Sequence, residues 1–191
     1  GVGQIDDEAG EAKIKKPMSD IPTPSAAAAQ KEVIVVPDNA EPIVSIYTDP
    51  EMQGTKVQLF ITRPAFPTAL ANTVSWEATN VIESYVSIME NARLQEIAMQ
   101  PDAPFLGAGM SSGDVIGVIP TLKATVFVAL TQEGNLNRGF ETLYTDMERM
   151  RRYGFTQGEF ERAQENLMRQ IERTYANRND RDNAYYISLY L

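Results

Sequence analysis

Side chains that could do chemistry are few in this 191-residue chain, because it contains neither histidine nor cysteine. Histidine is the commonest metal ligand and general base, so its absence excludes metal sites of the usual His type and His-dependent nucleophilic triads. The absence of cysteine excludes disulfides and thiol chemistry, and it leaves the redox compartment open. Any metal ion would have to be held by oxygen ligands alone.

Three acidic clusters are the remaining candidates for a metal or acid–base site. They are Asp6-Asp7-Glu8, Glu159-Phe160-Glu161 and Asp180-Arg181-Asp182. None has the spacing of a calcium-binding loop, so we interpret them as solvated helix ends and loops. Two acids facing each other across a cleft would suit glycoside chemistry, but spacing along the chain does not test that arrangement. We therefore predict no catalytic, cofactor-binding or metal-binding residue in this chain.

Other catalytic and binding motifs are also missing. The chain has no Ser-x-x-Lys motif and no Gly-x-Ser-x-Gly elbow. Glycines 107, 109, 113 and 117 lack the Gly-Lys-Ser/Thr ending of a phosphate loop, and turns and bulges explain them better. A net charge of −9 argues against a nucleic-acid partner, and we interpret the basic residues within Glu148–Arg152 as a charged helix C-terminus. No apolar run approaches the roughly 18 residues of a membrane span.

The clearest local motif in the sequence is a corner between two predicted helices around Gly154. Thr156 and Glu159 have the spacing of a capping box, and Phe155 and Phe160 stand where the two ends of a hydrophobic staple would be. Gly154 suits the left-handed residue that closes a preceding helix. The helices on either side each carry an apolar stripe, namely Leu136, Phe140, Leu143, Tyr144, Met147 and Met150 before the corner, and Phe160, Ala163, Leu167, Ile171 and Tyr175 after it. We expect the two stripes to cover one flat apolar surface.

The rest of the chain alternates between strands and helices. A short helix capped by Asp6 or Asp7 and ending near Pro17 is followed by a connector, Ile21–Gln30. Three predicted strands come next: Val33–Val36, Ile43–Thr48 and Thr55–Thr62. A helix from about Ala69 to Met99 has the apolar stripe Ala78, Val81, Ile82, Tyr85, Met89 and Ala92, and we expect Trp76 to act as a packing anchor.

Three further strands follow that helix. They are Phe105–Gly109, Asp114–Ile119 and Lys123–Leu130, with turns at Ser111-Ser112-Gly113 and Pro120-Thr121. This element order predicts the α+β class, a mostly antiparallel sheet with helices packed on one face. Ala184–Leu191 is strongly apolar, so we expect the domain to continue beyond Leu191 in a longer polypeptide.

Four stretches, in order, resemble one family, the pitrilysin/insulinase-type zinc metallopeptidases, which include the mitochondrial processing peptidases. Val2–Pro22 resembles the "Gly-Asp-Ile-Asp … Ile-Lys-Lys-Tyr-Phe-Ser-Asp-Ile-Pro" segment that ends the family's zinc-bearing domain, although Gln4 replaces an aspartate and Pro17-Met18 an aromatic pair. Val36–Phe60 resembles the entry to the next domain. Glu90–Ala108 is similar to the family's Arg-Leu-x-Glu followed by Ala-Pro-Phe, and Gly154–Arg173 is similar to its Gly-Phe-Thr-x-x-Glu-x-x-Arg-Ala corner.

This resemblance implies a peptidase of two or four similar domains that close a chamber around peptides. Its zinc motif, His-x-x-Glu-His with a distal glutamate, would lie in a preceding domain, so zinc is expected in the parent protein and not here. Residues 1–31 would be the tail of that catalytic domain plus a linker, and residues 32–191 a non-catalytic domain of the pitrilysin/processing-peptidase type. The expected partners are the catalytic domain, the other domains of the parent and the peptide substrate.

Two other readings stay open. The chain could belong to a family member without peptidase activity that serves as a scaffold or partner subunit, in which case the His-x-x-Glu-His motif would be lost upstream. It could also be an independent carboxylate-based hydrolase, which zinc-binding and peptide-cleavage assays would test. Peptide specificity, compartment and assembly are not determined by the sequence.

Overall fold

The structure is a computed structural model, and it describes residues 6–23, 34–52, 54–115 and 119–190. The chain divides into two units, of which one is Val33–Met168 and the other combines Gly1–Glu32 with Arg169–Leu191. The helix α4 (Gln157–Ala176) runs across this division. The predicted boundary between residues 1–31 and 32–191, which assigns the first segment to a preceding catalytic domain, stays a prediction.

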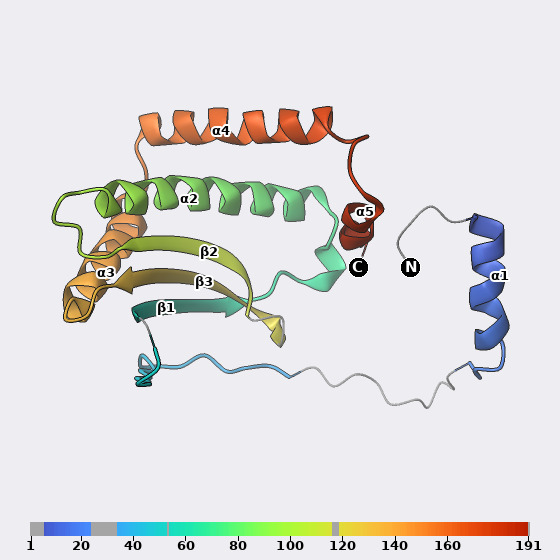
Figure 1. Cartoon of the computed structure of the whole chain (residues 1–191), viewed down its shortest axis with the longest axis horizontal. Helices are drawn as coiled ribbons and strands as arrows, with labels where there is room; N and C mark the ends of the chain where they lie inside the picture. The colour runs from blue at the N-terminus through green and yellow to red at the C-terminus, as the bar shows by residue number, and fades with distance from the viewer. Residues whose placement is uncertain (1–5, 24–33, 53, 116–118, 191) are drawn as a thin grey trace. The chain divides into compact units, whose positions relative to one another are not determined.

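In the larger unit, the described strands form one antiparallel sheet of three strands (Figure 1). They are β1 (Thr55–Pro64), β2 (Gly107–Val115) and β3 (Ile119–Thr131), in the order β1-β3-β2. Ala129 of β3 pairs with Val57 on one side and Ala108 on the other, which places these three side chains on one face. The sheet and its helices confirm the predicted α+β class.

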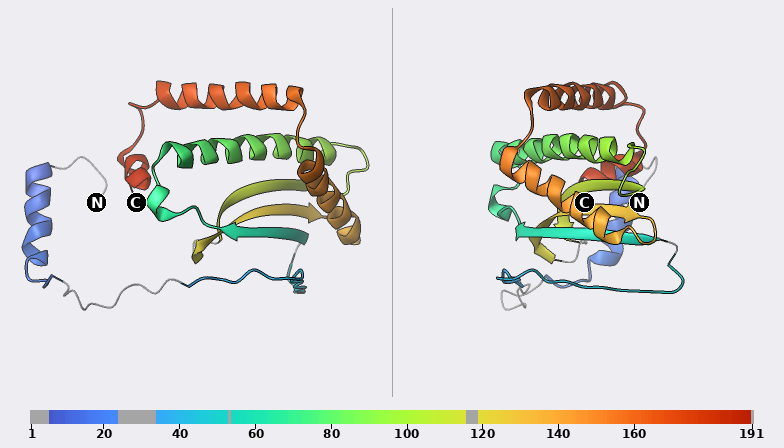
Figure 2. Two further views of the ribbon diagram at one scale, coloured as in Figure 1. Left: turned by 180° about the vertical axis from the view of Figure 1, so that it is seen from behind. Right: turned by 90° about the vertical axis from the view of Figure 1, so that its left-hand side faces the viewer.

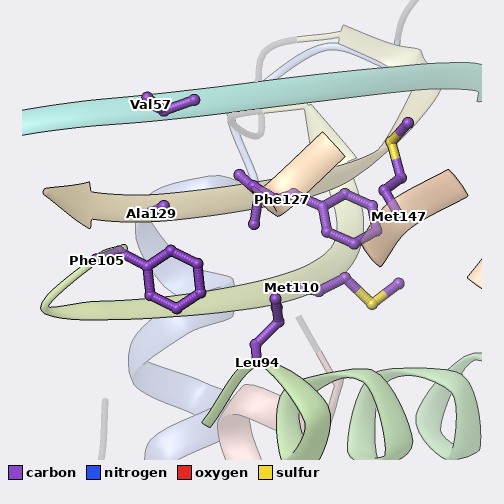
Figure 3. Close-up of a cluster of buried hydrophobic side chains, with 8 residues drawn as sticks. Val57, Leu94, Phe105, Met110, Phe127, Ala129 and Met147 are labelled. Carbon is purple, nitrogen blue, oxygen red and sulfur yellow. The ribbon is translucent and has the colours of Figure 1, made fainter. Parts of the chain in front are cut away.

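The core lies between that face and two helices, α2 (Val74–Ala98) and α3 (Leu136–Tyr153). Figure 3 shows Phe127 of β3 beside Met147 of α3, and Leu94 of α2 beside Met110 of β2, all within one buried cluster. Leu94, Phe127 and Leu143 are completely buried. Full burial of each such side chain stabilises the folded state by about 1.5–3 kcal/mol. This cluster therefore holds both helices to the same side of the sheet.

Helix α2 runs along the sheet beside β2, as the two views of Figure 2 show. It begins at Val74 and not near Ala69, because Asn72 has a left-handed φ of 61° and Thr73 caps the helix by accepting from the Trp76 amide. The side-chain amide of Asn91 donates to the Met110 carbonyl and accepts from the Met110 amide, at 2.9 and 2.8 Å. Asn91 thereby satisfies backbone groups on the edge of β2 that pairs with none of the described strands.

The predicted apolar stripe of α2 is largely wrong. Of its members, Met89 is buried and Tyr85 is half-buried, whereas Val81 and Ile82 are exposed. The buried face comprises Met89, Glu90, Arg93 and Leu94. Two of these four residues are charged, and a search for apolar periodicity passes over them. Trp76 is half-buried and lies outside the core cluster, so it is not the expected anchor.

The three strands predicted between Phe105 and Leu130 are two longer strands, β2 and β3, which pair antiparallel. Ser111-Ser112-Gly113, predicted as a turn, lies inside β2, and Pro120-Thr121 lies inside β3. The face of β2 away from the core consists of Gly107, Gly109, Ser111 and Gly113, which resembles a turn in composition although it is a strand. The connection at residues 116–118 lies outside the described residues.

The predicted strands Val33–Val36 and Ile43–Thr48 are not found within the described residues 34–52. A strand needs a neighbour to satisfy its backbone groups, and no described strand pairs with either segment. The Ile34 carbonyl instead accepts from the Thr121 hydroxyl at 2.7 Å. Ile43 and Ile46 consequently remain 82% and 86% exposed.

In the smaller unit, helix α1 (Asp7–Met18) confirms the predicted N-terminal helix, with Asp6 accepting from the Ala9 amide and Pro17 in the last turn. The predicted connector Ile21–Gln30 lies mostly outside the described residues. The polar residues 177–182 separate α4 from α5 (Asn183–Tyr190), whose first turn is capped by Asp182. The apolar segment Ala184–Leu191, from which we expect the domain to continue beyond Leu191, therefore forms most of α5. Leu191 itself lies outside the described residues.

Candidate functional site

The corner between α3 and α4 is built as its local sequence predicts. Gly154 closes α3 with a positive φ of 65°, which a residue with a side chain rarely adopts. The Glu159 amide donates to the Thr156 hydroxyl at 3.3 Å, and the Thr156 amide donates to the Glu159 carboxylate at 2.6 Å. The reciprocal capping box is therefore confirmed, and it fixes the direction in which α4 leaves the corner.

Arg93 of α2 reaches this corner from a distant part of the sequence. Its guanidinium forms an ion pair with both carboxylate oxygens of Glu159 and donates to the Gly154 carbonyl at 3.0 Å. It also stacks over the Phe155 ring, with 4.4 Å between the guanidinium carbon and the ring centroid. Arg93 is only 6% exposed, so one buried cation holds the end of α3 and the start of α4 against α2.

The two phenylalanines beside the cap each contact α2. Phe155 lies under Arg93, and Phe160 packs on Tyr85 with 5.2 Å between the ring centroids. The start of α4 therefore covers α2, while α3 covers the sheet. The expectation that both apolar stripes share one flat surface is wrong, because the capping box turns α4 onto a helix. Within the α4 stripe, Ala163 is buried and Ile171 and Tyr175 are exposed.

The charge of Glu159 is stabilised by its partners. The hydrogen bond from Arg93, helped by those from the Thr156 amide and hydroxyl, lowers the pKa of Glu159 to about 2. The same hydrogen bond raises the pKa of Arg93 above its usual value. Both groups are therefore fully ionised at neutral pH, and they interact as an ion pair.

A pair of acids, Glu90 and Asp146, lies in the interior near Arg93, whose contacts with Gly154, Phe155 and Glu159 are called the Arg93 clamp. Glu90, one turn before Arg93 on α2, is completely buried, and Asp146 of α3 is 5% exposed. Burial, followed by the charge of Asp146, raises the pKa of Glu90 to about 8. Two facing carboxyl groups can act as acid and base in hydrolases. Glu90 is inaccessible to a substrate, however, so the structure does not support the carboxylate-based hydrolase.

The open surface nearest to these residues is a groove of about 440 Å³ between α2 and the first half of α4. Its floor includes Arg93, Glu159 and Ala163, and its rim carries the polar side chains of Asn91, Gln95, Glu96, Arg162 and Asn166. Glu90 and Asp146 do not line it. The groove thus exposes the Arg93–Glu159 ion pair on its floor and the carboxylate of Glu96 on its rim.

Each acidic cluster singled out in the sequence has a local structural role. Asp6 caps α1 and Asp182 caps α5. Glu159 belongs to the capping box, and the Glu161 carboxylate accepts from the side-chain amide of Gln157. Within the described residues, no group of three or more acidic side chains is arranged to hold a metal ion. The prediction that the chain has no catalytic, cofactor or metal residue stays a prediction.

The basic run at the end of α3 is paired within its own helix. Arg151 and Arg152 both donate to Glu148, and the hydrogen bond from Arg151 is the largest cause that lowers the pKa of Glu148 to about 2. Arg149 approaches Asp146 at 3.7 Å. These pairs agree with the interpretation as a charged helix end. Among the helices of the described part, none is both long and apolar enough to cross a bilayer.

Glu90, Arg93 and Asp146 were not among the candidate site residues predicted from the sequence. Arg93 and Glu159 are 66 residues apart, so no local motif connects them. The available signal was the pair Glu90 and Arg93, which share one helical face at a spacing of three between the apolar residues Met89 and Leu94. Charged residues inside an apolar stripe indicate a buried ionic network.

Comparison with known proteins gives structural matches only. No family model and no curated protein matches the sequence. The periplasmic protease PqqL from Escherichia coli matches with a TM-score of 0.73 and 21% identity, over 96% of this chain and 20% of that one. The first half of PqqL, solved separately, gives 0.72 and 20% over 96% of this chain and 38% of that one. A predicted insulinase family protease from Yersinia pestis gives 0.74 and 15%, over 97% of this chain and 38% of that one.

These matches show the fold. The fold of this chain matches the fold of one segment of these insulinase-family proteases. The chain spans well under half the length of each matching protein. The α+β fold predicted from the resemblance to this family is therefore confirmed.

Proposed function

We propose that the chain is a non-catalytic domain of a zinc-dependent metalloendopeptidase of the insulinase/pitrilysin type. The observation that carries this proposal is the structural likeness to insulinase-family proteases over 96–97% of the chain. The complete absence of histidine supports the non-catalytic role, because a zinc peptidase of this type holds its metal with histidines. The catalytic zinc would belong to a preceding domain of the parent protein.

In this role the chain contributes a rigid wall of the chamber that encloses the peptide. The Arg93 clamp and the core between the sheet and its two helices support this, since both fix helices in place without exposing a reactive group. The wall would position the catalytic domain and confine the peptide. No residue of the wall would take part in bond cleavage.

Exposed apolar side chains support a place within a larger protein. Val44, Ile46 and Tyr47 are each at least 75% exposed, and Phe60 and Leu130 lie half-exposed on the face of the sheet away from the core. Apolar clusters at the surface mark sites of protein–protein contact. We propose that other domains of the parent cover these residues.

The proposal is tested by dividing the parent protein into parts. We expect the 191-residue chain alone to cleave no fluorogenic peptide and to purify without bound zinc, and the parent protein to cleave peptides in a manner that a zinc chelator abolishes. Zinc-dependent cleavage by the chain alone would overturn the proposal. A parent protein without the His-x-x-Glu-His motif would instead support the scaffold or partner-subunit role.

A further inference from the structure

Buried polar atoms without a hydrogen-bond partner gather at one place in the described part of the chain. They are Oε1 and Oε2 of Glu90, Oδ2 of Asp146 and Nη1 of Arg93. A buried polar atom without a hydrogen-bond partner destabilises the folded state, so a cluster of them needs a physical explanation. Three of the four atoms are carboxylate oxygens, and two ionised carboxylates cannot hydrogen-bond to each other because both can only accept.

The charges around Glu90 do not neutralise it. The groups that act on it are Asp146 and Arg149 of α3 and Arg93 of α2, and no charged group of the sheet does so among the described residues. Arg93 is already paired with Glu159. Arg149 reaches Asp146 at 3.7 Å and is itself 59% exposed, which weakens its field. One negative charge of the Glu90–Asp146 pair is therefore left without a partner.

We propose that Glu90 keeps a proton that it donates in a hydrogen bond to Asp146, and that loss of this proton loosens the packing of α3 against α2. A protonated Glu90 can donate to Asp146, which gives the buried oxygens a hydrogen bond and removes one of the two negative charges. Removal of the proton leaves two carboxylates facing each other in the core. The pair is a proton-dependent latch between the two helices that cover the sheet.

The pH range of the latch follows from the direction of the shift. Because the pKa of Glu90 is raised in the folded state to about 8, the folded state binds more protons than the unfolded state between the two values. The stability from this proton is fully present below the unfolded value of 4.5 and is lost as the pH rises through about 8. The latch is therefore closed in acid and opens in the neutral to alkaline range.

Two measurements on the 191-residue chain test the latch. In carbon-13 NMR of the Glu side-chain carboxyls, from about pH 5 to about pH 9, we expect one resonance to titrate above pH 7 and to be missing from Glu90→Gln. Urea unfolding over the same range should show the midpoint falling with pH in the unmodified chain and staying nearly level in Glu90→Gln. Glu96→Gln, an exposed change on the same helix, is the matched control and should retain the fall.

A titration of Glu90 below about pH 5, or a fall of the midpoint that persists in Glu90→Gln, would overturn the proposal. If Glu90→Gln does not fold, Asp146→Asn decides the question. This variant keeps the Glu90 carboxyl and removes the neighbouring negative charge, so the Glu90 resonance should titrate at lower pH than in the unmodified chain. An unchanged titration would show that Asp146 has no part in holding the Glu90 proton.

Discussion

Replacing Glu159 with glutamine removes one negative charge from the α3–α4 corner and preserves the shape of the side chain. Glutamine at this position can still complete the capping box with Thr156. The substitution therefore isolates the ion pair with Arg93 from the local cap. It asks whether the long-range clamp contributes to stability beyond the motif that the sequence displays.

The expected loss at neutral pH is about 3 kcal/mol of unfolding free energy. Removing one partner of a buried ion pair typically costs about 3–5 kcal/mol, because the remaining charge is left uncompensated. Arg93 is buried, and the lowering of the Glu159 pKa from 4.5 to about 2 corresponds to about 3 kcal/mol. The Glu159 side chain is 15% exposed, which allows some solvent compensation and favours the lower end of the range.

The sign of the pH dependence is set by the lowered pKa of Glu159. The folded state holds this proton less tightly than the unfolded state, so the stability is present above the unfolded value of 4.5 and is lost as the pH falls through about 2. The stabilities of the unmodified chain and Glu159→Gln should therefore converge in acid. Above pH 5 the difference between them should be constant.

Urea unfolding followed by circular dichroism measures this difference, with Glu161→Gln as the control on the exposed side of the same helix. The double variant with Arg93→Met should be less destabilised than the sum of the single variants, because both members of the pair are then removed together. A loss below about 0.5 kcal/mol at neutral pH, with no coupling to Arg93, would refute the clamp.

Two further stability predictions follow from the geometry. Thr156→Ala should lower the unfolding free energy by about 1 kcal/mol, because it removes the hydroxyl that accepts from the Glu159 amide, and an unchanged melting temperature would contradict the capping role. Gly139→Ala should destabilise by about 1–3 kcal/mol, because its Cβ would lie 2.3 Å from the Thr131 methyl group where α3 meets β3. Gly158→Ala, whose Cβ would meet only the Arg162 side chain at 3.5 Å, is the control for that change and should be neutral or stabilising.

The features that the sequence predicted correctly are local. The capping box spans three residues and β1 alternates apolar and polar positions, so both can be recognised without knowing the fold. The strand predicted at Ile43–Thr48 is not found, because strand formation depends on pairing with a neighbouring strand. The composition of the segment does not show whether such a partner strand is present.

The burial of the ionic residues could not be predicted from the sequence, for a different reason. Glu90 and Arg93 occupy the core-facing side of α2, where a search for apolar periodicity expects hydrophobic residues. Their partners, Asp146 and Glu159, come from helices more than fifty residues away in the chain, and only the folded topology brings them together. β2 was misread because serine and glycine on its outer face are also the residues typical of turns.

The location of zinc and peptidase activity tests the central claim most directly. The measurement is the zinc content and peptide-cleavage rate of the 191-residue chain, made beside the same measurements on the parent protein. We predict that the chain alone has neither zinc nor activity and that the parent has both. Stoichiometric zinc bound by the carboxylates of this chain, with cleavage above the blank, would contradict the account.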